Sequence, residues 1–238
     1  MKKFVVSCLA VALMSGFAFA GVFQQGDGSK GDINVRLGLD LLGFVSMKQI
    51  DNSWILAENG DTKHSDNSKI GVSFSAEYLY PVLPVLKAGA GIGYLLPRKM
   101  ISPEYGVHED VDMSASYIPI YATAQPNPIK KYPEVFFKGN IGYSFFNSGD
   151  WDKDITKFFN EIYWTTDDDV VKITDKGGLY LALSAGYEFN FGLILDLSYS
   201  YYQASCDVKD SWNGGDSSGS ADFSYSVVGI SAGYKFKL

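Results

Sequence analysis

Apolar and polar residues alternate along the C-terminal end of the chain. Every second residue from Val228 to Leu238 is apolar, and the residues between them are small or charged. A period of two predicts a β-strand with one apolar and one polar face. Further strands are predicted upstream, and together the expected strands are 32–46, 69–80, 85–96, 116–125, 134–146, 178–189, 193–204 and 222–238. The pattern therefore indicates an all-β chain.

The connections between these strands alternate in length. Long polar loops are expected at 47–68, 97–115, 147–177 and 205–221, and short turns at 81–84, 126–133 and 190–192. A bare apolar edge at 222–238 is an aggregation hazard that pairing with 32–46 would remove by closing the sheet. We therefore predict an eight-stranded antiparallel up-and-down β-barrel with four long loops at one end. In strand 116–125 the two faces are not distinct, and Pro119 predicts a bulge or an irregular end.

The alternation alone fits either a membrane barrel with its apolar row outside or a soluble barrel with that row inside. The second face of the strands is rich in Gly and Ser, which suits a narrow lumen better than a water-facing surface. Gly-Tyr pairs also recur where two aromatic girdles would meet the membrane interfaces. The predicted girdle residues are Tyr94 and Tyr143 near the loop end, and Tyr187 and Tyr234 near the turn end.

Charged residues on the predicted inward face cluster near the turn end of their strands. They are Arg36, Glu77, Lys87, Lys138, Glu188, Asp196 and Lys235. Neighbouring signs around this ring are mostly opposite, so the side chains can pair, as buried charges require. We predict a salt-bridged ring that plugs the lumen, since eight strands leave room inside only for side chains. The alternative is that these charges are simply solvated at the barrel mouth.

The start of the chain indicates export. Lys2 and Lys3 precede an apolar stretch that ends at a small-x-small site, so residues 1–20 are a predicted signal peptide, cleaved after Ala20, and 21–31 a short periplasmic leader. Removing the two lysines takes the formal charge from −7 to −9, because residues 1–20 contain no acid. This balance argues against nucleic-acid binding.

Cys206 is then the single cysteine of the mature chain, which excludes an internal disulfide and a Cys-based metal site. After residue 20, no apolar run approaches the roughly 20 residues of a membrane helix.

Several blocks resemble the small outer-membrane β-barrel family, which includes the OmpA transmembrane domain, OmpW and opacity-like porins. They are SYIPIYATAQ, FFKGNIGYSFF, LSAGYEFNFGLILDLSYSYY and the ending AGYKFKL. Tyr234, Phe236 and Leu238 also resemble the C-terminal assembly signal of such proteins, with Leu in place of the usual Phe. The resemblance covers the region 32–238, and it implies an outer-membrane location with both mature termini in the periplasm.

That family includes anchors, adhesins, small channels and lipid-modifying enzymes, so the resemblance specifies architecture better than activity. We expect a non-enzymatic protein without a cofactor, with a structural or surface-interaction role through its extracellular loops. The expected partners are outer-membrane lipid or lipopolysaccharide, the outer-membrane assembly machinery through the C-terminal strand, and a surface ligand that the sequence does not identify. The alternatives are a narrow OmpW-like channel for small or apolar solutes and a lipid A-modifying enzyme.

The candidate chemistry lies in the predicted loops. His64, followed by Ser65 and Asp66, and His108 are the two histidines, but neither is on a predicted strand that would hold a catalytic triad in place. The run Asp167-Asp168-Asp169 has ligands suited to Ca²⁺ or Mg²⁺, although a solvated acidic loop is the favoured interpretation.

The loop 147–177 contains a helical pattern. Apolar residues in 150–164 recur at helical spacing behind Asp150, a plausible N-cap, and predict an amphipathic helix. The helix could cover the barrel mouth, lie on the outer leaflet or present an apolar face to a partner. A loop that packs on its own aromatic residues is the alternative.

Overall fold

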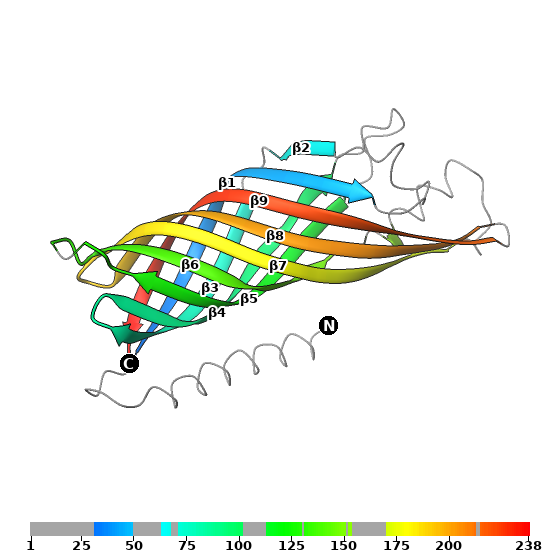
Figure 1. Cartoon of the computed structure of the whole chain (residues 1–238). Coiled ribbons are helices and arrows are strands. Elements are labelled where there is room, and N and C mark those ends of the chain that lie inside the picture. Colours follow the sequence, from blue (N-terminus) through cyan, green and yellow to red (C-terminus); the bar gives the residue numbers. More distant parts are fainter. Residues whose placement is uncertain are drawn as a thin grey trace.

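The computed structural model shows a closed antiparallel barrel (Figure 1). It describes residues 31–49, 63–67, 71–101, 113–129, 131–150, 152–153, 170–212 and 215–238. The barrel strands are β1 (Asp32–Gln49), β3 (Gly71–Leu83), β4 (Leu86–Ile101), β5 (Met113–Pro126), β6 (Val135–Asn147), β7 (Val170–Glu188), β8 (Leu193–Trp212) and β9 (Gly215–Lys237). Each pairs with the next along the chain, and β9 pairs with β1. The predicted eight-stranded up-and-down barrel is confirmed.

The closing seam joins the two ends of the barrel domain. The β1–β9 register runs from Asp32 opposite Lys237 to Gln49 opposite Ala221. One irregularity interrupts it, because the register shifts between Asp40 and Leu42. Leu41 and Leu42 are both exposed as a result, so the strand keeps its apolar row outside on both sides of the shift.

The outward face of the barrel is apolar and the inward face is polar along the turn half of the strands. In β1, Val35, Leu37 and Leu39 are exposed, whereas Asn34 and Arg36, which alternate with them, are buried. The same alternation in the other strands gives a continuous outer band of exposed Leu, Ile, Val, Phe and Tyr. An exposed apolar surface of this extent is typical of a membrane-facing barrel.

Three strands extend well beyond the others at the loop end (Figure 1). β7 begins at Val170 rather than 178, and β8 and β9 pair as far as Trp212 opposite Gly215. The loops predicted at 147–177 and 205–221 are therefore shorter than expected. The extensions of β8 and β9 are rich in Gly, Ser and Asp, and that of β7 contains Lys172, Asp175 and Lys176, so the sequence pattern predicts loops there. Alternation is nevertheless present, since Cys206 and Val208 are buried while Lys209 is exposed.

Two further predicted loops also contain strand. A short strand, β2 (Lys63–Asn67), lies within the stretch 47–68 and pairs with β1 over Gly43–Met47. β4 and β5 continue into the stretch 97–115, with the β4–β5 register shifting between Leu95 and Arg98. Pro119 is opposite Ser144 in an unbroken β5–β6 register. The irregularity predicted at Pro119 lies instead on its β4 side, where pairing is interrupted between Ile92 and Leu95.

Some predictions lie outside the described residues. They are the signal peptide at 1–20, the leader up to residue 30, His108, Asp167-Asp168-Asp169 and most of the helix at 150–164. At the start of that helix, Asp152 and Lys153 are helical, and the Lys153 N–H donates to the Asp150 carbonyl at 3.0 Å. Among the described residues, no helix is long and apolar enough to span a membrane.

Candidate functional site in the barrel lumen

Four charged side chains meet across the lumen and form what we call the central cluster: Arg36, Glu77, Lys138 and Asp196. They come from β1, β3, β6 and β8, so the cluster crosses the barrel instead of following its wall. Glu77 is the hub, with an exposed fraction of 2 %. Its carboxylate pairs with the Arg36 guanidinium and accepts from Lys138 Nζ at 2.9 Å. Arg36 Nε lies 3.1 Å from Asp196 Oδ2 on the other side.

The central cluster is tied to the aromatic residues above it by one hydrogen bond. Tyr121 Oη donates to Glu77 Oε1 at 3.0 Å. The Glu77 carboxylate therefore receives donors from three different strands, β1, β5 and β6. Charge-assisted hydrogen bonds of this kind compensate for the loss of hydration on burial.

A second group of charges, the turn-end cluster, lies closer to the short turns. It consists of Asp32, Lys87, Glu188 and Lys235. Lys87 Nζ lies 2.9 Å from Asp32 Oδ2 and 3.6 Å from Glu188 Oε2, and Lys235 pairs with the same glutamate. The seven predicted ring residues are thus divided between two layers. Asp32 was missed, although its spacing from Asn34 and Arg36 places it on the inward face.

A third ionic contact lies toward the loop end. Arg98 pairs with Asp40 and donates to the hydroxyl of Tyr225, whose ring centroid is 5.2 Å from the guanidinium carbon. Gly71 makes room for this arginine, because a Cβ at that position would lie 1.1 Å from Arg98 Nη2. Arg98 lies in the predicted loop 97–115, so the sequence pattern does not indicate this contact.

Each of these three layers balances its own charge. The central cluster holds two cations and two anions, the turn-end cluster holds two of each, and the Arg98–Asp40 pair holds one of each. The lumen therefore offers no excess of either sign along these layers. Ion-selective pores, by contrast, use rings of charges of one sign.

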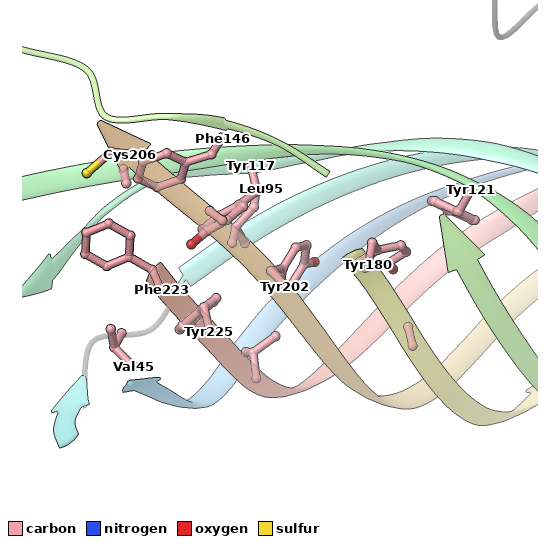
Figure 2. Packing of buried hydrophobic residues seen from close by; sticks show 14 of the residues in the cluster. Val45, Leu95, Tyr117, Tyr121, Phe146, Tyr180, Tyr202, Cys206, Phe223 and Tyr225 are labelled. Carbon is pink, nitrogen blue, oxygen red and sulfur yellow. The ribbon is translucent and has the colours of Figure 1, made fainter. Parts of the chain in front are cut away.

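Aromatic side chains fill the loop half of the lumen (Figure 2). We call this set the aromatic cluster: Tyr117, Tyr121, Phe146, Tyr180, Tyr202, Phe223 and Tyr225. Tyr117 is at its centre, with ring centroids 5.0 Å from Tyr202, 5.2 Å from Phe146 and 6.1 Å from Tyr225. These separations are those of rings in direct contact.

The aromatic cluster was not predicted from the sequence. Apart from the charged ring, the sequence pattern predicts mostly small residues inside, because the other inward positions are largely Gly and Ser. The signal that could have revealed the cluster is the run SYSYYQA, in which Tyr202 falls on the inward face shared by Asp196 and Ser200. A small cavity of about 80 Å³ is lined by side chains of both the aromatic and the central clusters, together with Asn140, Ser198 and Ser200.

The predicted girdle residues all lie on the outer surface. Tyr94, Tyr143, Tyr187 and Tyr234 have exposed fractions between 39 and 47 %. Three of them pack against a neighbouring Phe two residues along the same strand or its turn, with centroid separations of 4.8–5.1 Å. Phe236 and Leu238 of the predicted assembly signal are exposed on the same side as Tyr234.

The side chains of the predicted catalytic and metal-binding loop residues lie outside the described part of the structure. His64 lies on β2 with its backbone opposite Ser46, and its side chain is outside the described part of the structure. Among the described residues, no group of three or more His, Cys, Asp or Glu side chains is arranged to hold a metal ion.

Comparisons with known proteins identify the fold. No family model matches the sequence, and no curated protein matches it. The outer membrane protein OprG from Pseudomonas aeruginosa superposes with a TM-score of 0.53 and 16 % identity over 88 % of this chain and 98 % of its own. The outer membrane protein AlkL, solved in DMPC bilayers, gives 0.51 and 14 % over 90 % and 94 %. The chain therefore has the fold of the small outer-membrane β-barrels.

Proposed function

We propose that this chain is an outer-membrane β-barrel protein whose lumen is closed, and that it acts through structural or surface interactions at its loop end. The observation that carries the proposal is the stack of three charge-balanced ionic layers and one aromatic layer inside the barrel. The exposed apolar band and the aromatic girdles support the membrane location. The exposed row of Tyr234, Phe236 and Leu238 supports recognition of the C-terminal strand by an outer-membrane assembly machinery.

The proposed closure of the lumen rests on the side-chain contacts that a solute would have to break in order to pass. A passing ion or sugar would need to separate Glu77 from Arg36 and Lys138, which leaves charges buried without partners. It would then need to part the rings around Tyr117, which are in van der Waals contact. An eight-stranded barrel has an interior just wide enough for side chains to fill, which supports a lumen closed at these layers.

A narrow channel for small apolar solutes is the second candidate. The observation that favours it is the apolar lining of the loop half, where Tyr117, Tyr202 and Phe223 face the axis. An apolar solute could replace the contacts that these rings make with one another by contacts between the rings and the solute. It would still meet the central cluster below, so this function requires an exit above Glu77 or a rearrangement of the ion pairs.

Liposome swelling tests the closed lumen directly. Folded wild-type protein in phosphatidylcholine vesicles is expected to give the same swelling rate as protein-free vesicles with sugars of graded size. The control is recovery of the folded, heat-modifiable form from the same vesicles. Planar-bilayer recordings on the same preparation should show no steady open state. A size-dependent swelling rate or a large steady conductance would contradict the closed lumen and favour the channel.

A further inference from the structure

Two lysines face each other on the outward side of the loop-end extension. Lys172 in β7 and Lys209 in β8 are direct cross-strand partners, and both side chains are exposed. Residues directly opposite on one face have Cβ atoms about 4.5–5.5 Å apart, and like charges in such a pair are unfavourable. The arrangement differs from the lumen, where Arg36, Lys87, Lys138 and Lys235 all have acidic partners.

The acid two residues before Lys209 on β8 does not compensate this pair. Asp207, on the same outward face of β8, is engaged by Lys176 at 2.7 Å. Within the described residues, neither Lys172 nor Lys209 makes an ion pair. The positions next to them carry hydroxyls instead, because Thr174 follows on the same face of β7 and Ser218 is opposite Lys209 on β9. We call Lys172, Thr174, Lys209 and Ser218 the loop-end patch.

The chemistry of the loop-end patch fits a phosphate group. Two ammonium groups and two hydroxyls can all donate hydrogen bonds, and an oxyanion can accept them from several sides at once. An anion bound between the lysines would also remove their mutual repulsion. An apolar or cationic ligand would gain nothing at these positions.

The height of the patch above the apolar band restricts where that phosphate can be. The outward row of β8 is aromatic at Tyr199 and Tyr201 and first becomes polar at Gln203, and Lys209 lies six residues farther along the strand. Six residues span roughly 20 Å, or about 15 Å along the membrane normal for the usual tilt of barrel strands. A phospholipid headgroup layer is only about 5–8 Å thick on each side. The phosphate must therefore project beyond simple headgroups.

We propose that the loop-end patch binds phosphate groups on the saccharide portion of an outer-leaflet glycolipid. This inference rests on the proposed function, because it takes the loop end of the barrel to lie outside the outer membrane. It adds a ligand class and a site to that proposal. A lipid of this kind would surround the extension laterally and leave the barrel mouth accessible.

The test compares glycolipid binding by the wild type and by Lys172→Gln/Lys209→Gln, each folded in phosphatidylcholine nanodiscs. The probes are lipopolysaccharide with phosphorylated core sugars, the same material after dephosphorylation, and lipid A without core sugars. Bound glycolipid is measured by native mass spectrometry over a titration. A basic residue near an anionic surface contributes about fivefold in affinity, so we expect about 30-fold weaker binding of the phosphorylated form by the double variant. Lys172→Arg/Lys209→Arg should keep the affinity.

Lys131→Gln, an exposed lysine at the turn end, is the matched control and should bind as the wild type does. Equal binding of phosphorylated lipopolysaccharide by wild type and double variant would overturn the inference. The inference would also be overturned if the wild type bound lipid A without core sugars as tightly as phosphorylated lipopolysaccharide. Displacement of bound lipopolysaccharide by inorganic phosphate at the same concentration would overturn it as well. A protein that fails to insert into phosphatidylcholine bilayers, or that conducts ions, would contradict the proposed function instead. Insertion and liposome swelling are measured separately from glycolipid binding, so the two failures can be told apart.

Discussion

Glu77→Ala is expected to lower the free energy of unfolding by about 3–5 kcal/mol, the usual cost of leaving a buried charge without its partner. The substitution removes the carboxylate that pairs with Arg36 and Lys138 and accepts from Tyr121. Arg36 keeps its pairing with Asp196, but Glu77 is the only acid with which Lys138 forms an ion pair among the described residues. The loss should be measured by urea unfolding of the protein folded into lipid vesicles, where the transition is followed by tryptophan fluorescence.

Two matched variants separate charge pairing from packing at this position. Glu188→Ala removes a carboxylate from the turn-end cluster, which is closer to solvent, so its effect should be clearly smaller. Glu77→Leu/Lys138→Met removes an anion and a cation together and leaves the Arg36–Asp196 pair, so it should recover most of the stability. If the double variant is as unstable as Glu77→Ala, the hub role of Glu77 in the charge network is wrong.

The topology of the barrel could be predicted from the sequence because its cause is local and repetitive. Each membrane-facing strand must show lipid an apolar residue at every second position, as Val35, Leu37 and Leu39 do in β1. The alternation of long loops and short turns then gives the up-and-down order. The parity of Arg36, Glu77 and Lys138 within their strands likewise placed them on one face before any contact was known.

The loop half of the barrel could not be predicted in this way. Outside the membrane, both faces of a strand can carry polar residues. The loop-end parts of β7, β8 and β9 therefore lack a clear apolar row, and their sequence predicts a loop. The aromatic cluster was missed for a related reason. Tyr199 faces outward and Tyr202 inward, and nothing in the run SYSYY itself distinguishes a girdle tyrosine from a lumen tyrosine. The parity of each ring with the inward residue Asp196 assigns it to a side, and the register across β7 and β9 agrees with that assignment.

If several layers close the lumen, removing one of them should not be enough to open it. Arg36→Ser/Glu77→Ser/Lys138→Ser/Asp196→Ser removes two cations and two anions together, so no central charge is left unpaired. This quadruple variant should fold, and its free energy of unfolding should fall less than that of Glu77→Ala. Removing one partner of a buried ion pair leaves an unpaired buried charge, whereas removing both partners does not. It should still be silent in planar bilayers, because the rings around Tyr117 remain in contact above the emptied layer.

Adding Tyr117→Ala and Tyr202→Ala to the quadruple variant should convert the silent barrel into a channel with steady, stepwise conductance. The two rings lie 5.0 Å apart at the centre of the aromatic cluster, and the turn-end side chains that remain are partly exposed to solvent, so removing both rings should open a water-filled path through the emptied central layer. The resulting pore should discriminate little between cations and anions, since the remaining Arg98–Asp40 pair and turn-end cluster are each neutral. The tyrosine pair changed alone is the control and should not conduct. Conductance from the quadruple variant alone would show that the charges by themselves close the lumen, and a folded but silent sixfold variant would locate the closure outside these two layers.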